Sequence, residues 1–366
     1  MKLLFTNFHE RYGGGHDTYI FTLCKDLVNT QNIVVAAPPE SLLLEKIATV
    51  VGVKTFPFNF QFRINKVFSL VKKIVKLSKF LAAERFNIVH VNGSKDHTLV
   101  LLASIFLDKR PKIIFTKHNS LPLKFGARIR LRYFTDHIIV VSEYIKLMFS
   151  CYKTPVKVIY NGVDTTFFQP YASAIVSALK QKFGIPAANL VFGSVAGTAL
   201  YKGWSVFLEA IALLPPKLLQ KITVIIAGSV PSEEIKKYRL ENQVIFPGLL
   251  FDVREVIAVS DVGFVLSYVM EALSFACREM MSMGKPVIVS DCGGLPENIT
   301  NGVDGYIVKA KNVASVKNCV MEIMERPQQL LTMSENARKK AVKFFSKEKF
   351  IADTLAVYKM FENRNV

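Results

Sequence analysis

Short apolar segments alternate with segments of helical period along most of this chain, and no other feature constrains the fold as strongly. Residues 2–7 are typical of a strand, and residues 17–29 carry apolar side chains at the spacing of one helical face. Those side chains belong to Ile20, Leu23, Cys24 and Leu27. Because the strand-like segments are apolar at nearly every position, they fit a parallel sheet covered by helices on both faces. We therefore predict an α/β fold.

The alternation occurs in two series. The first has strand-like segments at 2–7, 32–38, 87–92, 112–118, 137–142 and 157–161. The second has them at 190–196, 222–228, 244–248, 261–267, 286–291 and 304–308. Residues 164–189 contain two prolines and interrupt the pattern, so a domain boundary is expected there. In open parallel sheets ligands bind outside the carboxyl ends of the strands, which directs attention to the loops that follow them.

The composition narrows the class of protein. The chain has 366 residues, 51% of them hydrophobic, which is enough for two packed domains. No apolar run approaches the ~20 residues that span a bilayer. Its five cysteines are scattered, as is typical of reduced thiols in a cytoplasm. We therefore expect a cytoplasmic protein.

The charge balance is strongly basic, with 47 Lys and Arg against 29 Asp and Glu and a net charge of +18. Such a balance favours anionic partners: nucleic acid, an acidic membrane face or an anionic substrate. The chain has neither zinc-finger spacing nor an RNP-like string, so nucleic acid is not expected.

Residues 267–308 carry the strongest local signal. The pattern predicts a helix with Ser274 as its N-cap and Gly284 just past its end. The free amides at the start of such a helix form an anion site. These amides belong to Phe275, Ala276 and Cys277.

Two glutamates, Glu271 and Glu279, lie eight positions apart in the same segment. Eight helical residues rise about 12 Å. The acid and nucleophile of a glycosidase need roughly 5–9.5 Å, so these carboxylates are better suited to two parts of one long ligand. The alternative is that both are ordinary solvated charges.

Several motifs in order resemble the retaining nucleotide-sugar glycosyltransferases of family 4, which have the GT-B fold. The Glu-x7-Glu pair is followed by MSMGKPVIVSDCGGLPE and NGVDGYIV. Residues 158–170 resemble the interdomain hinge of that family, and residues 201–214 its Lys-Gly loop and helix. Residues 135–149 and 246–267 resemble its first-domain strand and its base-binding loop.

The resemblance implies two Rossmann-like domains that face each other across a cleft. The first would comprise residues 1–165, with a C-terminal helix at about 349–366 packing back on it. The second, at 166–348, would bind the donor, a nucleotide-diphosphate sugar.

The resemblance also implies a role for individual residues. Glu279 would bind the ribose hydroxyls, Glu271 a hydroxyl of the donor sugar, and Lys202 the diphosphate. Loops near Gly228 and Gly248 would read the base through backbone groups, with UDP expected over GDP. The catalytic set would be Lys202 and Glu271 with a histidine that faces the donor sugar, His118.

The stretch RYGGGHD at 11–17 lacks the G-x-G-x-x-G spacing of a dinucleotide site. Either it is a plain turn, or Gly14 and Gly15 bring bare backbone against the phosphate or sugar of the donor. Next to them, His16 and Asp17 are candidate groups on the acceptor side.

The chain departs from the family pattern at one cation. The arginine that usually stands six residues before the lysine is Ala196 here, so another basic side chain supplies that charge or the donor is held differently. We find no Asp-x-Asp, the motif that holds a divalent metal in another fold of glycosyltransferase. We therefore expect a retaining, metal-independent enzyme without a cofactor.

Residues 63–86 form the best helical pattern of the first series. Apolar residues at 64, 67, 68, 71, 74, 75 and 81 share one face, and lysines crowd the other. Basic residues expected at a membrane surface are Lys66, Lys72, Lys73, Lys76, Arg128, Arg130 and Arg132. The pattern fits a core-facing helix with a solvated basic face, a surface that docks on an anionic inner leaflet, or both.

Taken together, these features predict a glycosyltransferase that moves a sugar from a nucleotide-diphosphate sugar to a glycan or lipid-linked acceptor, in lipopolysaccharide or polysaccharide biosynthesis. Alternatives on the same fold are a sugar-nucleotide epimerase and a sugar-phosphate glycosyl synthase. A non-enzyme alternative is a basic α/β protein that binds membranes or nucleic acid.

Overall fold

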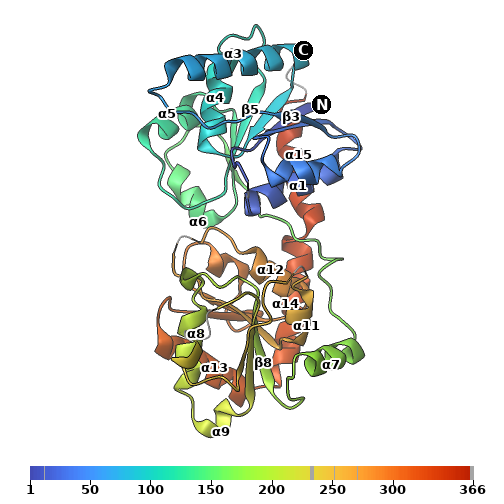
Figure 1. Cartoon of the computed structure of the whole chain (residues 1–366), viewed down its shortest axis with the longest axis vertical. Helices are drawn as coiled ribbons and strands as arrows, with labels where there is room; N and C mark the ends of the chain where they lie inside the picture. Colours follow the sequence, from blue (N-terminus) through green and yellow to red (C-terminus); the bar gives the residue numbers. More distant parts are fainter. Residues whose placement is uncertain (12, 231–234, 251, 270, 363–366) are drawn as a thin grey trace. The chain divides into compact units, whose positions relative to one another are not determined.

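The computed structural model describes residues 1–11, 13–230, 235–250, 252–269 and 271–362. The chain divides into two compact units (Figure 1). Unit 1 comprises Met1–Tyr160 and Phe350–Val366, and unit 2 comprises Asn161–Lys349. Both are α/β units built on parallel sheets, which confirms the predicted fold class.

Unit 1 contains a parallel sheet of seven strands in the order β3-β2-β1-β4-β5-β6-β7. The strands are β1 (Lys2–Thr6), β2 (Asn32–Ala37), β3 (Lys54–Pro57), β4 (Ile88–Val91), β5 (Lys112–Lys117), β6 (His137–Val140) and β7 (Val156–Val158). The sequence pattern predicted all of them except β3. That strand lies at the edge of the sheet and is largely exposed, so it lacks the apolar run that marks the others.

Helices cover this sheet: α1 (Gly15–Leu27), α2 (Leu42–Ala48), α3 (Val67–Glu84), α4 (Ser94–Ser104), α5 (Phe125–Tyr133), α6 (Glu143–Lys146) and α15 (Lys347–Lys359). Helix α1 buries the apolar face that its sequence predicts. The C-terminal helix α15 contributes Phe350 and Tyr358 to the core around β1, α1 and β4. The Tyr358 hydroxyl also bonds Nδ1 of His90 at 2.6 Å.

Helix α3 corrects the expectation that the apolar face of residues 63–86 packs in the core. Only Leu77 and Leu81 are buried, whereas Phe68 is 88% exposed and Val71 50%. Helical periodicity identifies an apolar stripe but does not reveal whether any element covers it. Lys73 is a second correction, because its Nζ donates hydrogen bonds to the carbonyls of Asn59 and Gln61 and does not extend from the basic face.

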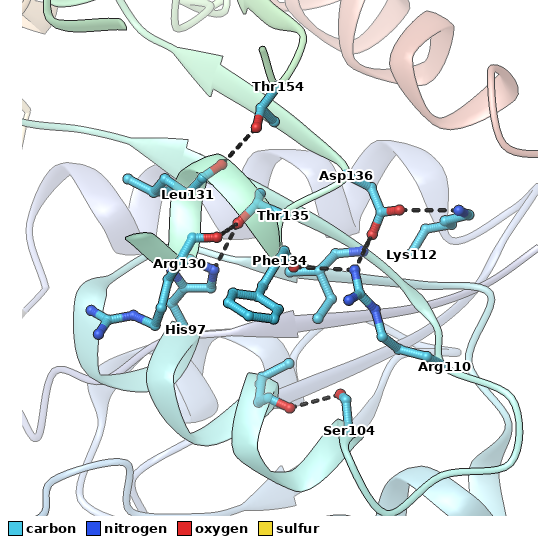
Figure 2. Close-up of polar contacts among 12 residues, drawn as sticks. His97, Ser104, Arg110, Lys112, Arg130, Leu131, Phe134, Thr135, Asp136 and Thr154 are labelled. Carbon is cyan, nitrogen blue, oxygen red and sulfur yellow. Dashed lines mark hydrogen bonds and ion pairs between the residues drawn. The ribbon is translucent and has the colours of Figure 1, made fainter. Parts of the chain in front are cut away.

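Helix α5 is held at its C-terminal end by threonine hydroxyls (Figure 2). The Thr135 hydroxyl donates to the carbonyl of Arg130 at 3.0 Å and accepts from Nε2 of His97 at 3.0 Å. The Thr154 hydroxyl donates to the carbonyl of Leu131 at 2.7 Å. The Thr154 bond satisfies a carbonyl that a helix end leaves without a partner, and the Thr135 bond adds a second donor to a carbonyl that already accepts from the amide of Phe134. Together they fix α5 on unit 1.

Unit 2 contains a parallel sheet of six strands in the order β10-β9-β8-β11-β12-β13. The strands are β8 (Leu190–Ser194), β9 (Ile222–Ile226), β10 (Val244–Ile245), β11 (Val262–Val265), β12 (Val287–Ser290) and β13 (Gly305–Val308). All of them fall within the predicted segments. Their helices are α7 (Ser173–Lys182), α8 (Trp204–Ala212), α9 (Pro216–Leu219), α11 (Arg254–Val259), α12 (Phe275–Ser282), α13 (Val313–Glu325) and α14 (Gln329–Phe344).

The strand order of each sheet reverses at one point, between β1 and β4 in unit 1 and between β8 and β11 in unit 2. Loops diverge at such a point and leave a crevice at the carboxyl ends of the strands, where ligands bind in open α/β sheets. The glycine loop follows β1, and the Lys202 loop follows β8. Both motifs therefore stand where the fold favours binding.

Candidate active site

The structure brings two of the predicted donor residues of unit 2 together. Lys202 ends the short helix η2 (Leu200–Lys202) after β8, and Glu271 lies in the loop after β11. Their side chains form an ion pair of 2.8 Å and are only 21% and 12% exposed. The Ser267 hydroxyl donates to the same Glu271 oxygen at 2.8 Å. A half-buried lysine held by a single carboxylate is a cation that an incoming polyanion can bind.

Glycines allow the loops around this pair to approach one another. Gly203 has φ 76°, and a Cβ there would lie 2.1 Å from the carbonyl oxygen of Leu266. Gly293 has φ 57°, and its Cβ would lie 2.0 Å from the carbonyl oxygen of Glu271. Any side chain at either position would force the loops apart. The sequence pattern identified Gly203, but the close approach of Gly293 became visible only in the fold.

Helix α12 starts as predicted, with one correction. The Ser274 hydroxyl caps the helix by accepting from the amide of Cys277 at 3.2 Å. That amide is therefore not free for an anion, and the Cys277 side chain is fully buried. The amides of Phe275 and Ala276 have no acceptor within the described part of the chain, so they are the two that remain for a ligand.

Glu279 lies half-buried one turn inside α12. Its carboxylate has neither a hydrogen bond nor an ion pair with any residue that the structure describes. Burial raises the pKa of this carboxyl to about 7. An unpartnered carboxylate at the border of the interior is a strong acceptor for hydroxyl groups of a ligand.

The two predicted base-binding loops lie side by side. The amide of Gly228 donates to the carbonyl of Gly248 at 2.8 Å, and both residues have positive φ. A Cβ on Gly228 would lie 2.6 Å from the methyl group of Thr198, whose carbonyl accepts from the indole of Trp204. The loops after β8, β9 and β10 therefore meet mainly through backbone, as a site that reads a base through main-chain groups requires.

No arginine stands within two residues of Ala196 in the sequence, but a lysine of another loop contacts the loop that carries Glu271. Nζ of Lys311, which follows β13, lies 4.4 Å above the ring of Tyr268. The amide of Tyr268 in turn donates to the carbonyl of Tyr201, beside Lys202. Lys311 has a left-handed φ of 57° and no ion pair with a described carboxylate. Lys309, two residues earlier, is paired with Asp291 at 2.8 Å.

In unit 1, Asp17 holds the glycine loop and does not face an acceptor. It is only 1% exposed, and its oxygens accept from the amide of Gly13 at 2.8 Å and from Nδ2 of Asn7 at 2.7 Å. This finding corrects its predicted role. Gly14 has φ 54° as the N-cap of α1, so a glycine is required there. Gly15 opens the helix and is exposed.

Three histidines stack beside this loop. The ring of His16 lies 4.6 Å from that of His9 and 4.2 Å from that of His118. Burial lowers the pKa of all three, that of His16 to about 3, so they are neutral near pH 7. His9 was not among the predicted site residues, although its place just after the first strand was a usable signal. No group of three or more His, Cys, Asp or Glu residues in the described ranges is arranged to hold a metal ion.

The hydrogen bonds of Asn92 fix the tautomer of His118. Nδ2 of Asn92 donates to the carbonyls of Thr6 and His90, so its Oδ1 accepts from Nε2 of His118 at 2.9 Å. The proton of His118 is therefore on Nε2, and Nδ1 is left as an acceptor. A neutral imidazole of this kind can orient a substrate hydroxyl.

The two halves of the chain match two family models. Residues 13–167 match the model described as Glycosyltransferase Family 4, and residues 176–340 match the one described as Glycosyl transferases group 1. A curated relative is the UDP-Gal:alpha-D-GlcNAc-diphosphoundecaprenol alpha-1,3-galactosyltransferase of Escherichia coli. It is 28% identical over 301 residues, which cover 75% of this chain and 76% of the relative.

Solved structures share the fold over the whole chain. A glycosyltransferase from Rickettsia africae has a TM-score of 0.88 at 17% identity and covers 100% of this chain and 99% of its own. HepE of Anabaena, solved in complex with UDP, has a TM-score of 0.85 at 21% identity and covers 98% of this chain and 100% of its own. With its two parallel sheets and both family models, the chain is a glycosyltransferase of the GT-B type.

Proposed function

We propose that this glycosyltransferase transfers a sugar from a UDP-sugar to a glycan or lipid-linked acceptor of a bacterial surface polymer such as lipopolysaccharide. The observation that carries the proposal is the cluster in unit 2: the pair of Lys202 and Glu271, the unpartnered carboxylate of Glu279 and the two free amides of α12. The UDP bound to HepE and the UDP-Gal in the name of the Escherichia coli relative support the choice of nucleotide.

Each group in unit 2 has a chemical task in this proposal. Glu279 accepts hydrogen bonds from both ribose hydroxyls, and the amides of Phe275 and Ala276 bind phosphate or sugar oxygens. Lys202 leaves Glu271 for the diphosphate and stabilises the charge that develops on the leaving group. Glu271, once released, accepts a hydroxyl of the donor sugar. The reaction proceeds with retention and without a metal.

Lys311 is the side chain that we propose in place of the missing arginine. It has no carboxylate partner among the described residues, and its contact with Tyr268 ties it to the loop that carries Glu271. A cation held on an aromatic ring can move to a diphosphate at low cost, because the ring contact is worth only about 0.5–1 kcal/mol at an exposed site.

In unit 1, Nδ1 of His118 accepts a hydroxyl of the donor sugar, and the backbone at Gly14 and Gly15 approaches the phosphate or sugar of the donor. His16, whose ring contacts that of His118, serves the acceptor side. The basic character of the chain is concentrated here: residues 1–160 contain 24 Lys and Arg against 10 Asp and Glu, whereas residues 161–349 contain 21 against 17.

This charge supports docking of unit 1 on an anionic inner leaflet. Helix α3 exposes Val67, Phe68, Val71 and Val75, and Lys66, Lys72 and Lys76 lie beside them. Each cation near such a surface contributes about 1 kcal/mol of attraction. No helix in the described ranges is long and apolar enough to cross a bilayer.

The decisive experiment is a calorimetric titration with UDP, GDP and a panel of nucleotide sugars, followed by an assay of sugar transfer. We expect UDP and one UDP-sugar to bind the wild-type chain and the variant Glu279→Ala to bind both more weakly. Equal affinity for UDP and GDP would contradict the choice of base. A complete lack of nucleotide binding would contradict the proposed function.

A further inference from the structure

A hollow of about 320 Å³ lies in unit 1 beside the start of α5. Its lining residues are Pro122, Leu123, Arg128, Met148, Cys151 and Tyr152. They come from the loop after β5, from α5 and from the segment between α6 and β7, which begins with η1 (Leu147–Phe149). Since His118 opens that same loop after β5, the hollow belongs to the ligand-binding edge of the sheet.

The hollow is suited to a ligand with an apolar part and a charged part. Carbon-rich side chains form most of its wall, and apolar side chains next in sequence to lining residues or at the start of α5 are exposed: Leu121 (45%), Phe125 (79%) and Leu147 (72%). Soluble domains rarely leave such a group of apolar side chains in water without a binding role. A free sugar or a glycan alone would gain little from these surfaces.

Among the described residues that line the hollow, Arg128 alone is charged, and it is a cation. Nε of Arg128 donates to the carbonyl of Leu123 at 3.0 Å, which fixes the side chain, and Arg128 forms no ion pair with a described carboxylate. Residues 118–135 contain Lys124 and three arginines and no Asp or Glu. The charge therefore complements an anionic group at the rim of an apolar hollow.

Helix α5 holds this wall in place. The threonine bonds at its C-terminal end (Figure 2) and the bond of Arg130 Nη2 to the Ser94 hydroxyl at 3.2 Å anchor it to the rest of unit 1. The hollow is thus formed before a ligand arrives, which lowers the entropic cost of binding.

We infer that this hollow binds the phosphate-proximal part of the apolar chain of a lipid-phosphate acceptor, with Arg128 on the phosphate. Its volume lies at the low end for ligand pockets, so it accommodates only the first part of a long chain. The inference rests on the proposed function and narrows its acceptor from glycan or lipid to a phosphorylated lipid.

Cys151 makes the inference testable without a transfer assay. It is the exposed thiol of the chain and lines the hollow, whereas Cys292 is half-buried in unit 2 next to Gly293, so its alkylation reports a probe bound at the donor site instead. The full chain is treated with N-ethylmaleimide, and alkylation of each thiol is followed by mass spectrometry. The probes are farnesyl phosphate below its micelle concentration, farnesol, inorganic phosphate and vesicles of anionic phospholipid.

We expect farnesyl phosphate to slow alkylation of Cys151 by about tenfold at ten times its Kd and to leave Cys292 unchanged. Farnesol should protect less, and inorganic phosphate should not protect. Arg128→Gln should lose the difference between farnesyl phosphate and farnesol, whereas Arg132→Gln, one turn further along α5, should keep it. Thermal melts identify any variant that is misfolded.

Three outcomes would overturn the inference. Protection by inorganic phosphate alone would mean a simple anion site, and protection by vesicles but not by farnesyl phosphate would mean contact with the membrane surface. No protection by any probe would mean that the hollow is unused. Because UDP binding is measured separately, a chain that binds UDP without protection of Cys151 refutes this inference alone, and one that binds no nucleotide refutes the proposed function.

Discussion

The two units share one strand order around the reversal point and carry opposite chemistry. Unit 1 holds all six histidines of the chain, and the pKa of each lies below its usual value because of burial. Unit 2 has no histidine and places carboxylates and lysines at the corresponding loops. The difference shows that a common sheet fixes where a ligand site lies, whereas loop residues decide what it binds.

The two units also differ in where their charged side chains lie. Except for Lys117, which is buried at the end of β5, the described lysines and arginines of unit 1 are at least partly exposed, and its imidazoles are neutral. Unit 2 instead buries part of the Lys202–Glu271 pair and leaves Glu279 without a partner among the described residues. Unit 1 is therefore suited to bind an acceptor and an anionic membrane surface, and unit 2 is suited to bind a charged nucleotide-sugar donor. Each of the following experiments should affect one unit and spare the other.

The largest effect is expected for Lys202→Gln. Loss of a cation that stabilises the leaving diphosphate should lower kcat by about 10²–10³-fold, with a smaller loss of UDP affinity. Lys309→Gln is the matched control, since Lys309 is a lysine of unit 2 already paired with Asp291. A fall of less than threefold in kcat for Lys202→Gln would show that Lys202 does not stabilise the leaving diphosphate.

Neutralisation of three cations of α3 and its N-cap should be next in size. Lys66, Lys72 and Lys76 changed together to Gln should weaken co-sedimentation with anionic vesicles by about 10²-fold, at about 1 kcal/mol for each cation. Nucleotide binding by unit 2 should not change. Lys217, Lys221 and Lys343 of unit 2, changed in the same way, control for net charge. Equal losses in the two triple variants would show that total charge, and not α3, determines binding.

Acid should loosen unit 1 before unit 2. The folded-state pKa of each histidine is below its unfolded value of about 6.5, so the unfolded chain binds more protons as the pH falls through 6.5 toward 4. The fully buried His90 and His97, with pKa values of about 3, should each cost about 1 kcal/mol of stability at pH 5.5. Burial raises the pKa of Asp96 to about 7, so this carboxyl stabilises unit 1 as the pH falls. It is a single group, however, and the six histidines act in the other direction.

Hydrogen exchange on the full chain tests this order. Protection factors of peptides from β4 and β5 should fall between pH 7 and pH 4.5, while those from β11 and β12 should hold. Burial of Glu279 acts in the opposite direction in unit 2, because its raised pKa stabilises the fold as the pH falls from about 7 toward 4.5. Loss of protection in unit 2 at a higher pH than in unit 1 would contradict this prediction.

Glu279 should also make donor binding depend on pH. Its carboxyl has a pKa of about 7, so the ionised form that accepts ribose hydroxyls is lost below that value. The affinity for UDP-glucose, which has no group of its own titrating there, should fall by about tenfold from pH 8 to pH 6. Glu279→Gln should bind weakly at both values. A pH dependence that survives this substitution would assign the titration to another group.

The smallest effect is expected for Lys311→Gln. Loss of one exposed phosphate contact should weaken UDP binding by about threefold to fivefold and leave uridine binding unchanged. Lys309→Gln again provides the control. Equal losses for UDP and uridine would place Lys311 away from the diphosphate.

Much of the fold and part of the candidate site were predictable from the sequence. Strands β2 and β9 are apolar at every position but one, so local composition identifies them. The cap at Ser274 and the turn at Gly284 are also local, because a helix end is determined by a few neighbouring residues. Strand β3 was missed for the same reason, since an exposed edge strand has no strong local pattern.

The rest was decided by tertiary structure. Lys202 and Glu271 are separated by 69 positions, and their ion pair exists only because β8 and β11 are neighbours in the sheet. The stack of His9, His16 and His118 and the exposed stripe of α3 likewise depend on which elements pack together. The sequence by itself determined every described strand but β3, the cap of α12 and the order of the motifs, because these depend on short-range periodicity and sterics. Which side chains meet, and which remain unpartnered, depends on contacts between residues far apart in the chain, and only the folded structure defines those.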